Sequence, residues 1–153
     1  MRPILALLDL PPVWLIAHLA TAWMLAQGSP MVFGTVGDGL GRALVALGVG
    51  VTLVAVLQMS HHQTTVIPRR TPSALVTSGL FAWSRNPIYL ADTLILTGAI
   101  LWLDAVLALP MIAVFVWVIQ TRFIRDEETR LTIAFGPEFD LWAARTRRWI
   151  GRR

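Results

Sequence analysis

The sequence predicts an all-α integral membrane protein with about four transmembrane helices, both termini in the cytoplasm and a cytosolic extension of the last helix. Two observations predict this class. The 153-residue chain is 56% hydrophobic and only 14% charged, with a mean hydropathy of +0.64, whereas soluble domains average about 25% charged residues. The apolar residues also gather in four runs, and the arginines fall between or after these runs. We interpret residues 1–153 as a single membrane domain.

The first predicted span covers residues 12–27. It could imitate a secretory signal, because Ala20-Thr21-Ala22 resembles a cleavage site. However, Asp9 and two prolines interrupt the apolar region, and Arg2 is the only basic residue before it. We therefore expect an uncleaved first helix.

The second predicted span, residues 40–59, is the clearest, since about 20 apolar residues cross a bilayer core of about 30 Å. Residues 28–39 contain four glycines and a proline and are predicted to be a connection. Small residues on the second span allow a neighbouring helix to approach closely. These are Gly41, Ala46, Gly48 and Gly50.

The third and fourth predicted spans cover residues 87–102 and 105–121. Pro87 suits a first helical position and Asn86 suits the N-cap before it. Leu103-Asp104 is a plausible tight turn. Both spans are short for a full crossing, so we expect a hairpin, with a re-entrant pair as the alternative.

The fourth helical pattern continues to about Ala134, where Gly136-Pro137 ends it, giving a helix of about 45 Å. The last turns of this helix should lie in the cytoplasm. We also expect a cytosolic loop at 60–86 and a cytosolic tail at 122–153. Four spans put twelve of the thirteen arginines on one side and only Arg42 on the other. The positive-inside rule makes the richer side cytoplasmic. We expect a bacterial inner-membrane protein whose site faces the cytoplasm.

The composition also limits the chemistry. The chain has no cysteine, which excludes disulfides, thiolate catalysis and cysteine-bound zinc. All thirteen basic residues are arginine, and their positions fit anionic lipid headgroups. We expect membrane lipids as partners, and neither nucleic acid nor a metal.

Under this topology, a polar site forms where the loop ending in Ser84-Arg85-Asn86-Pro87 meets the stretch Arg125–Glu128. The start of the third helix suits a carboxylate, because its N–H groups are unpaired and carry partial positive charge. Glu127 or Glu128 could accept an ammonium group. Thr77-Ser78-Gly79 offers backbone that a ligand can approach, and Tyr89 could hydrogen-bond or stack against a ring.

Ordinary explanations compete with these roles. Arg85 could bind only a lipid phosphate, and Glu127 and Glu128 could be a solvated helix end. Asp92 lies inside a membrane helix, where a carboxylate needs a partner, and Arg85 is our candidate. Asp126 and Arg130 are interpreted as an i, i+4 surface pair, and His18 as a polar contact between helices. His61 and His62 are interpreted as groups at the membrane surface.

Residues 75–90 resemble the signature of the isoprenylcysteine carboxyl methyltransferase and phospholipid methyltransferase superfamily. The resemblance rests on Gly79, an aromatic residue and then Arg85-Asn86-Pro87-x-Tyr89. A second block follows in the expected order: Glu127-Glu128, Leu131, Phe135-Gly136-x-Glu138 and Arg147-Arg148-Trp149.

The resemblance implies a helical membrane enzyme that binds S-adenosylmethionine at its cytosolic face and takes a lipophilic acceptor from the bilayer. Arg85 and Glu128 would place the acceptor, as catalytic residues. Asn86 stands where histidine is common and cannot relay a proton. The implied cofactor-binding residues, with the neighbouring Thr77 and Ser78 added, are Thr77, Ser78, Gly79, Arg85, Asn86, Pro87, Tyr89, Glu127 and Glu128.

Methyl transfer from a sulfonium requires alignment of acceptor and methyl group and exclusion of water. A carboxylate acceptor, as in a prenylcysteine, would need an arginine clamp. An amine acceptor would need a proton sink, for which Glu128, Asp92 or a histidine could serve. Phospholipid N-methylation is our first interpretation. A membrane NADPH-dependent reductase of the sterol-reductase type and a non-enzymatic lipid-binding protein remain alternatives.

Overall fold

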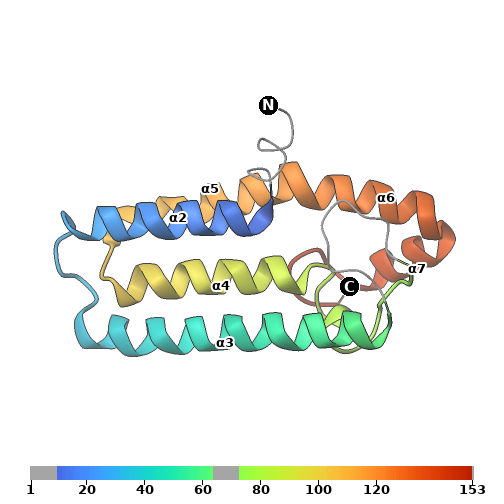
Figure 1. Ribbon diagram of the computed structural model, residues 1–153, viewed down its shortest axis with the longest axis horizontal. Coiled ribbons are helices and arrows are strands. Elements are labelled where there is room, and N and C mark those ends of the chain that lie inside the picture. The colour runs from blue at the N-terminus through green and yellow to red at the C-terminus, as the bar shows by residue number, and fades with distance from the viewer. Residues whose placement is uncertain (1–9, 64–72, 153) are drawn as a thin grey trace.

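The computed structural model describes residues 10–63 and 73–152, and these residues are helical apart from loops and one isolated antiparallel bridge, Thr146–Arg152. An antiparallel helical bundle forms most of the molecule (Figure 1). Its helices are α2 (Pro11–Ala26), α3 (Gly34–His61), α4 (Pro87–Trp102) and α5 (Pro110–Ile119). Short 3₁₀ helices precede α4 and α5, at Gly79–Ala82 and Val106–Ala108. A π-helical segment then leads from α5 into α6, and α7 follows: Gln120–Ile124, Arg125–Phe135 and Pro137–Arg145.

The helix boundaries confirm several predictions and correct others. The bounds of α4 are those predicted, and the last long helix ends at Phe135, before Gly136-Pro137. Helix α3 begins at Gly34, so the prediction that all of 28–39 is a connection is wrong. Helix α7 was not predicted. Gly136, with φ of 49°, redirects the chain, and Pro137 starts the next helix.

Helices α3 and α4 pack with their backbones in close contact. A Cβ atom on Gly41 would lie 2.5 Å from both Gly98 O and Trp102 N, and one on Gly48 would lie 2.8 Å from Ala91 O. We call Gly41, Gly48 and Gly98 the glycine seam. The prediction of a close approach is confirmed for Gly41 and Gly48. It is wrong for Ala46, which is exposed, and for Gly50, where a Cβ atom would have no neighbour within 4 Å.

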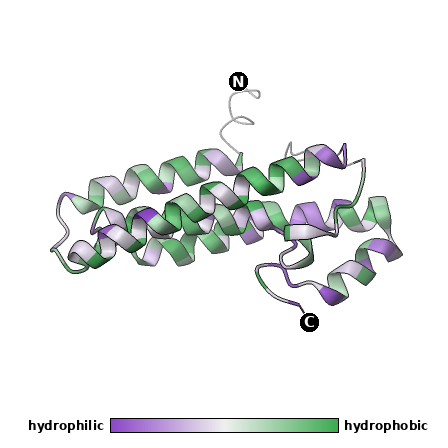
Figure 2. Cartoon of the chain, turned by 90° about the horizontal axis from the view of Figure 1, so that it is seen from below, coloured by the Kyte–Doolittle hydropathy of each residue, from purple (hydrophilic) through white to green (hydrophobic). Residues whose placement is uncertain are grey.

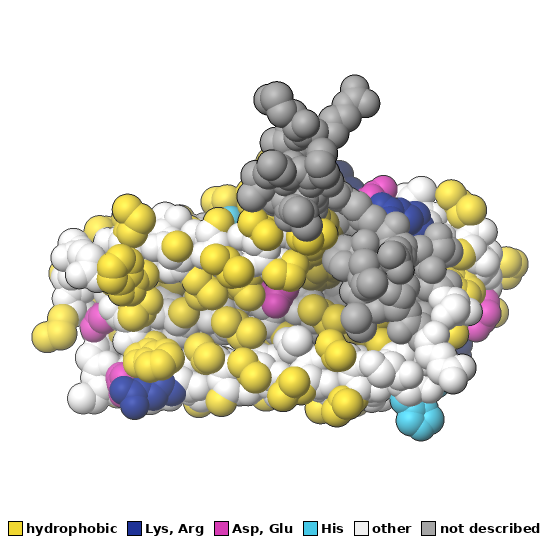
Figure 3. Space-filling view, in the orientation of Figure 1, with side chains coloured by type: hydrophobic (Ala, Val, Ile, Leu, Met, Phe, Trp, Pro, Cys, Tyr) yellow, Lys and Arg dark blue, Asp and Glu magenta, His cyan; other side chains and the backbone are white. Residues whose placement is uncertain are grey.

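The outside of the bundle is apolar. Helix α3 and the helical stretch Val106–Phe135 are long and apolar enough to cross a membrane, and their most apolar windows are only 17% and 33% buried. A core helix of a soluble protein would be mostly buried. Figure 2 shows that apolar residues run along the helices of the bundle, and Figure 3 shows hydrophobic side chains spread over one face of it. The large apolar side chains that are exposed include Ile16, Trp23, Leu47, Leu53, Leu57 and Trp117. This surface suits contact with lipid.

The antiparallel order gives the bundle two different ends (Figure 1). At one end, the loop 27–33 meets the turn 103–105, and we call this the turn end. At the other, the start of α4 meets α6 and residues 146–152, and we call this the charged end. Arg2, Arg69 and Arg70, which contributed to the predicted orientation, lie outside the described residues.

Candidate functional site

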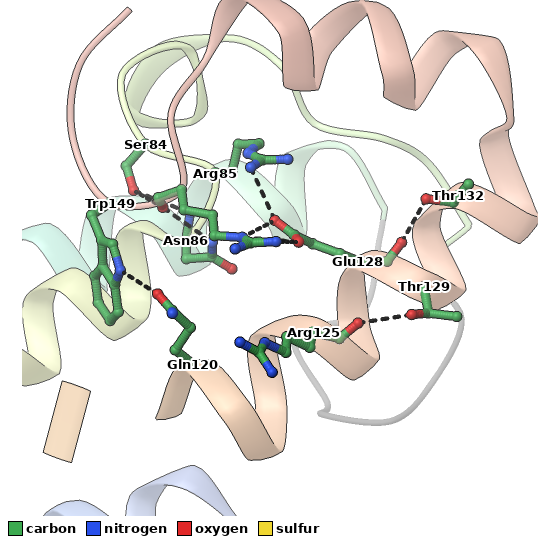
Figure 4. A network of polar contacts seen from close by, with 10 residues as sticks. Ser84, Arg85, Asn86, Gln120, Arg125, Glu128, Thr129, Thr132 and Trp149 are labelled. Atoms are coloured by element: carbon green, nitrogen blue, oxygen red, sulfur yellow. Dashed lines mark hydrogen bonds and ion pairs between the residues drawn. The ribbon is translucent and has the colours of Figure 1, made fainter. Parts of the chain in front are cut away.

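The charged end is built around an ion pair between the loop before α4 and helix α6. Arg85 Nη2 lies 3.1 Å from Glu128 Oε1, and the two side chains are only 9% and 14% exposed. Pro87 sets the direction of the chain into α4, and the continuous helix from α5 into α6 carries Glu128 to the same place. The structure therefore brings together the two residues that the sequence suggested as catalytic (Figure 4).

A second arginine, Arg148, binds the same carboxylate. Its Nε donates to both oxygens of Glu128 at 2.9 Å, and its Nη2 donates to Oε2 at 2.5 Å. Hydrogen bonding to Glu128 raises the pKa of Arg148 above its ordinary value. Two guanidinium groups share one carboxylate, so Arg85, Glu128 and Arg148 form an ion cluster with a net charge of +1. From the sequence, Arg148 was only part of a closing basic motif, and nothing local linked it to Glu128.

The chain after α7 holds the signature loop in place. Residues 146–152 form what we call the C-terminal hairpin. Its Arg148 carbonyl accepts hydrogen bonds from Asn86 Nδ2 at 3.1 Å and Ser84 Oγ at 3.3 Å (Figure 4). The Arg85 N–H donates to Arg147 O at 3.0 Å. Asn86 occupies the predicted N-cap position, but its side chain does not cap α4. It binds the hairpin instead.

The two neighbouring acids of α6 have different partners. Tyr89 Oη donates to Glu127 Oε1 at 2.7 Å, whereas Glu128 belongs to the ion cluster. Tyr89 is almost fully buried and lies in the first turn of α4. The start of α4 therefore contacts α6 at two points. The neutral hydroxyl of Tyr89 binds Glu127, and the cationic side chain of Arg85 binds Glu128.

The surroundings of Gly79 bear on the expectation that a ligand approaches the backbone there. Thr77, Ser78 and Gly79 are exposed. Gly79 has φ of +59°, and a Cβ atom there would collide with Gln58 Nε2. Gln58 Oε1 also accepts a hydrogen bond from Leu80 N at 3.2 Å. The side chain of Gln58 from α3 thus lies against Gly79 on the side of its Cβ position. The expectation that a ligand approaches this backbone stays a prediction.

The other polar residues divide between corrections and confirmations. Arg85 pairs with Glu128, so its predicted pairing with Asp92 is wrong. Asp92 lies buried on α4.

Two other expectations for polar residues are confirmed. His18 packs edge-to-face on Phe115 of α5, as expected for a contact between helices. The predicted surface pair Asp126–Arg130 is present, and His61 and His62 lie exposed near the end of α3.

The π-helical segment contributes a residue that sequence reasoning missed. Gln120 Oε1 accepts a hydrogen bond from Trp149 Nε1 at 3.1 Å (Figure 4). Single π-helical turns inside α-helices are frequent at functional sites. Here the segment joins the apolar α5 to the polar α6 and anchors the C-terminal hairpin.

A groove of about 600 Å³ lies beside the hydrogen bond between Gln120 and Trp149. Its volume is within the range of about 300–1,000 Å³ that is typical of ligand sites. The groove is lined by Arg147, Arg148, Trp149 and Ile150.

The fold and the site together define a class: a helical bundle with a lipid-compatible surface and a charged site at one end. The chain belongs to the phospholipid methyltransferase family, since the model of this family matches residues 38–138. No curated protein and no solved structure matches the chain. The match covers most of α3 and all of α4, α5 and α6, including Arg85 and Glu128, and ends before the C-terminal hairpin.

Family membership makes the chain an enzyme that uses S-adenosylmethionine to methylate a phospholipid-type acceptor. It favours the methyltransferase interpretation over both the nicotinamide-dependent reductase and the non-enzymatic lipid-binding protein.

Proposed function

We propose that this enzyme methylates the amine of a phospholipid headgroup, of the phosphatidylethanolamine type, at the cytosolic face of a membrane. One observation carries the proposal: the Arg85–Glu128–Arg148 ion cluster stands at the end of an apolar helical bundle. Two of its three members fall within the part of the chain that matches the family. Charged groups at the edge of an apolar bundle can meet a lipid headgroup without drawing the acyl chains into water.

The residues of the charged end fit the zwitterionic end of S-adenosylmethionine. The ion cluster carries a surplus cation, and with the start of α4 it suits a carboxylate. Glu127 contacts a neutral hydroxyl, that of Tyr89, and suits an ammonium group. We assign Asn86 and Pro87 to shaping this site, together with Thr77, Ser78 and Gly79 at its approach. The cofactor supplies an electrophilic methyl group on a sulfonium.

Arg85 and Glu128 are the proposed catalytic residues. An ammonium headgroup must lose a proton before its nitrogen can attack a methyl group. The Glu128 carboxylate is a candidate acceptor for that proton. Arg85, being largely buried, fixes the orientation of Glu128. The main contribution of the protein is then alignment and exclusion of water.

The proposal places four spans in the membrane, near residues 12–27, 40–59, 87–102 and 105–121, with both termini in the cytoplasm. The outward apolar side chains of the bundle support this arrangement. The distribution of arginine supports the orientation, because the charged end carries Arg85, Arg148 and their neighbours while Arg42 lies near the turn end.

The function is tested with purified enzyme in mixed micelles and labelled S-adenosylmethionine. Label should appear in phosphatidylethanolamine, and S-adenosylhomocysteine should bind in a calorimetric titration. Arg85→Ala should lose turnover. Label only in a carboxylate lipid, such as a prenylcysteine, would contradict the amine assignment.

The orientation is tested by single cysteines, which are unambiguous because the chain contains none. Met31→Cys lies at the turn end and Leu141→Cys lies on α7, and both positions are exposed. In right-side-out vesicles, a membrane-impermeant maleimide should label position 31 and leave position 141 unlabelled. Equal labelling of both positions in sealed vesicles would contradict the proposed topology.

A further inference from the structure

The C-terminal hairpin presents a defined surface beside the ion cluster. The Thr146–Arg152 bridge and a hydrogen bond from Arg147 N to Gly151 O at 3.0 Å close the hairpin. Gly151 N donates to Trp83 O at 2.7 Å and so ties the hairpin to the signature loop. The residues of its turn line the groove of about 600 Å³. The groove therefore has one wall held in a fixed conformation.

This wall is strongly cationic. Two of the four residues that line the groove are arginines, Arg147 and Arg148, and none of the four is acidic. Arg147 is exposed, and the Arg148 side chain is still 39% exposed while it binds Glu128. Because Glu128 is shared with Arg85, it does not neutralise both guanidinium groups. The groove therefore attracts an anion, and the planar guanidinium groups suit the geometry of a phosphate.

The same wall is also apolar. Ile150 is 65% exposed, and Trp149 packs against the core of the bundle while its indole N–H is held by Gln120. A tryptophan held in this way presents an apolar ring next to a polar edge, which is typical of residues at a membrane surface. Arginine beside tryptophan and isoleucine fits an amphiphile better than a free ion.

We propose that this groove binds the phosphate of the acceptor phospholipid through Arg147 and Arg148, so that the headgroup amine reaches Arg85 and Glu128. This inference rests on the proposed function and adds to it the group by which the acceptor is recognised. It also assigns a role to a segment that lies beyond the residues matched by the family.

The decisive variant is Arg147→Gln, because Arg147 lines the groove and its side chain is not part of the ion cluster. Its KM for phosphatidylethanolamine in mixed micelles should rise about tenfold, as expected for loss of one charge-assisted hydrogen bond. Its KM for S-adenosylmethionine should stay within about twofold of the wild type, the change expected from a distant surface charge. Arg145→Gln is the matched control, since Arg145 is exposed on α7 and donates to Leu141 O. Its KM values should equal those of the wild type.

Two competitors identify the source of the phosphate. Phosphatidylglycerol in the micelles should inhibit competitively against phosphatidylethanolamine, and inorganic phosphate should inhibit far more weakly. Equal inhibition by both would assign the groove to a free phosphate and overturn the lipid assignment.

The remaining outcomes separate this inference from the proposed function. An unchanged lipid KM in Arg147→Gln, with an active wild type, would overturn the inference alone. A rise in the KM for S-adenosylmethionine as large as that for the lipid would assign the groove to the cofactor and also overturn it. A wild type that labels no phospholipid amine would overturn the proposed function itself.

Discussion

The glycine seam and the charged end both involve helix α4, but they hold it by opposite means. At the seam, Gly41 and Gly98 bring two backbones together and leave no side chain that could move. At the charged end, the long side chains of Arg85, Arg148 and Glu128 make the contact. A lipid or cofactor has no group that can replace a backbone contact of the seam. A carboxylate, phosphate or ammonium group can exchange with an ion pair. On the basis of this difference, we propose that the seam serves the fold and the charged end serves binding.

The largest expected effect comes from breaking the ion cluster. Glu128→Gln removes the carboxylate that both Arg85 and Arg148 bind. We expect kcat/KM to fall about 100-fold, as for removal of one partner of a buried charge pair. Binding of S-adenosylhomocysteine should weaken as well. Steady-state kinetics and calorimetric titration measure the two effects.

The matched control is Asp126→Asn, which makes the same change of charge two residues away. Asp126 pairs with Arg130 one turn along α6, and its side chain is 55% exposed. Such surface pairs contribute about 0–1 kcal/mol, so this variant should stay close to wild-type activity. If both variants lost activity equally, the effect would come from the charge of α6 and not from the cluster.

The second prediction tests the seam by adding one methyl group. Gly41→Ala places a Cβ atom 2.5 Å from two backbone atoms of α4, which cannot rotate away. We expect a loss of about 2 kcal/mol in the free energy of unfolding, from overpacking of about 1–3 kcal/mol. Gly50→Ala is the control on the same helix, because nothing lies within 4 Å of its Cβ position. It should gain up to about 1 kcal/mol from higher helix propensity. Unfolding by SDS in mixed micelles, followed by circular dichroism, measures both. A Gly41→Ala variant as stable as Gly50→Ala would contradict the close packing.

The same contrast explains what could be predicted from the sequence. Pro87 and Gly136-Pro137 are local signals, and they located the start of α4 and the end of α6. The meeting of Arg85 with Glu128 followed from the hairpin topology and the family signature. The start of α3 at Gly34 was missed because glycine disfavours a helix locally. There, packing against α4 outweighs this preference, since tertiary contacts stabilise most helices in proteins.

The role of Arg148 had no local signal at all. Its approach to Glu128 depends on the backbone bonds from Gly151 to Trp83 and from Arg85 to Arg147, each of which joins residues more than sixty positions apart. The position of Gln58 beside Gly79 likewise requires α3 and the signature loop to be in place first. Contacts of this kind have no periodicity or motif in the sequence.

A smaller effect is expected from the loss of the hydrogen bond that the neutral hydroxyl of Tyr89 makes at the charged end. Tyr89→Phe removes the hydrogen bond to Glu127 and keeps the ring. Loss of a hydrogen bond to a charged group costs about 1.5–3 kcal/mol, so we expect the KM for S-adenosylmethionine to rise about tenfold. Thr93→Val is the control, because the Thr93 hydroxyl bonds only within α4, to Tyr89 O. Equal KM values in both variants would remove Glu127 from the cofactor site.

The smallest effect is expected from a change at the turn end, away from the charged end. Asp104 accepts backbone hydrogen bonds from Val32 and Phe33 through Oδ1 and from Gly34 through Oδ2, at 2.9 to 3.0 Å. These bonds lower the pKa of Asp104 from its ordinary value. A depressed pKa stabilises the folded state above the pKa of the unfolded chain, about 3.9, and this contribution is lost as the pH falls through the lower folded value.

Asp104→Asn should therefore reduce the unfolding temperature slightly at pH 7, with the difference from the wild type shrinking as the pH falls below about 4. Asparagine tolerates the positive φ of 51° at this position, so the backbone of the turn is kept. Asp38→Asn, which breaks the exposed pair with Arg42, serves as the control. Methyl transfer at pH 7 should be unchanged in both variants, because backbone donors hold Asp104 in the fold and no exchangeable ion pair is involved. A loss of activity in Asp104→Asn without a loss of stability would show that the turn end also takes part in catalysis, and the division between the two ends would no longer hold.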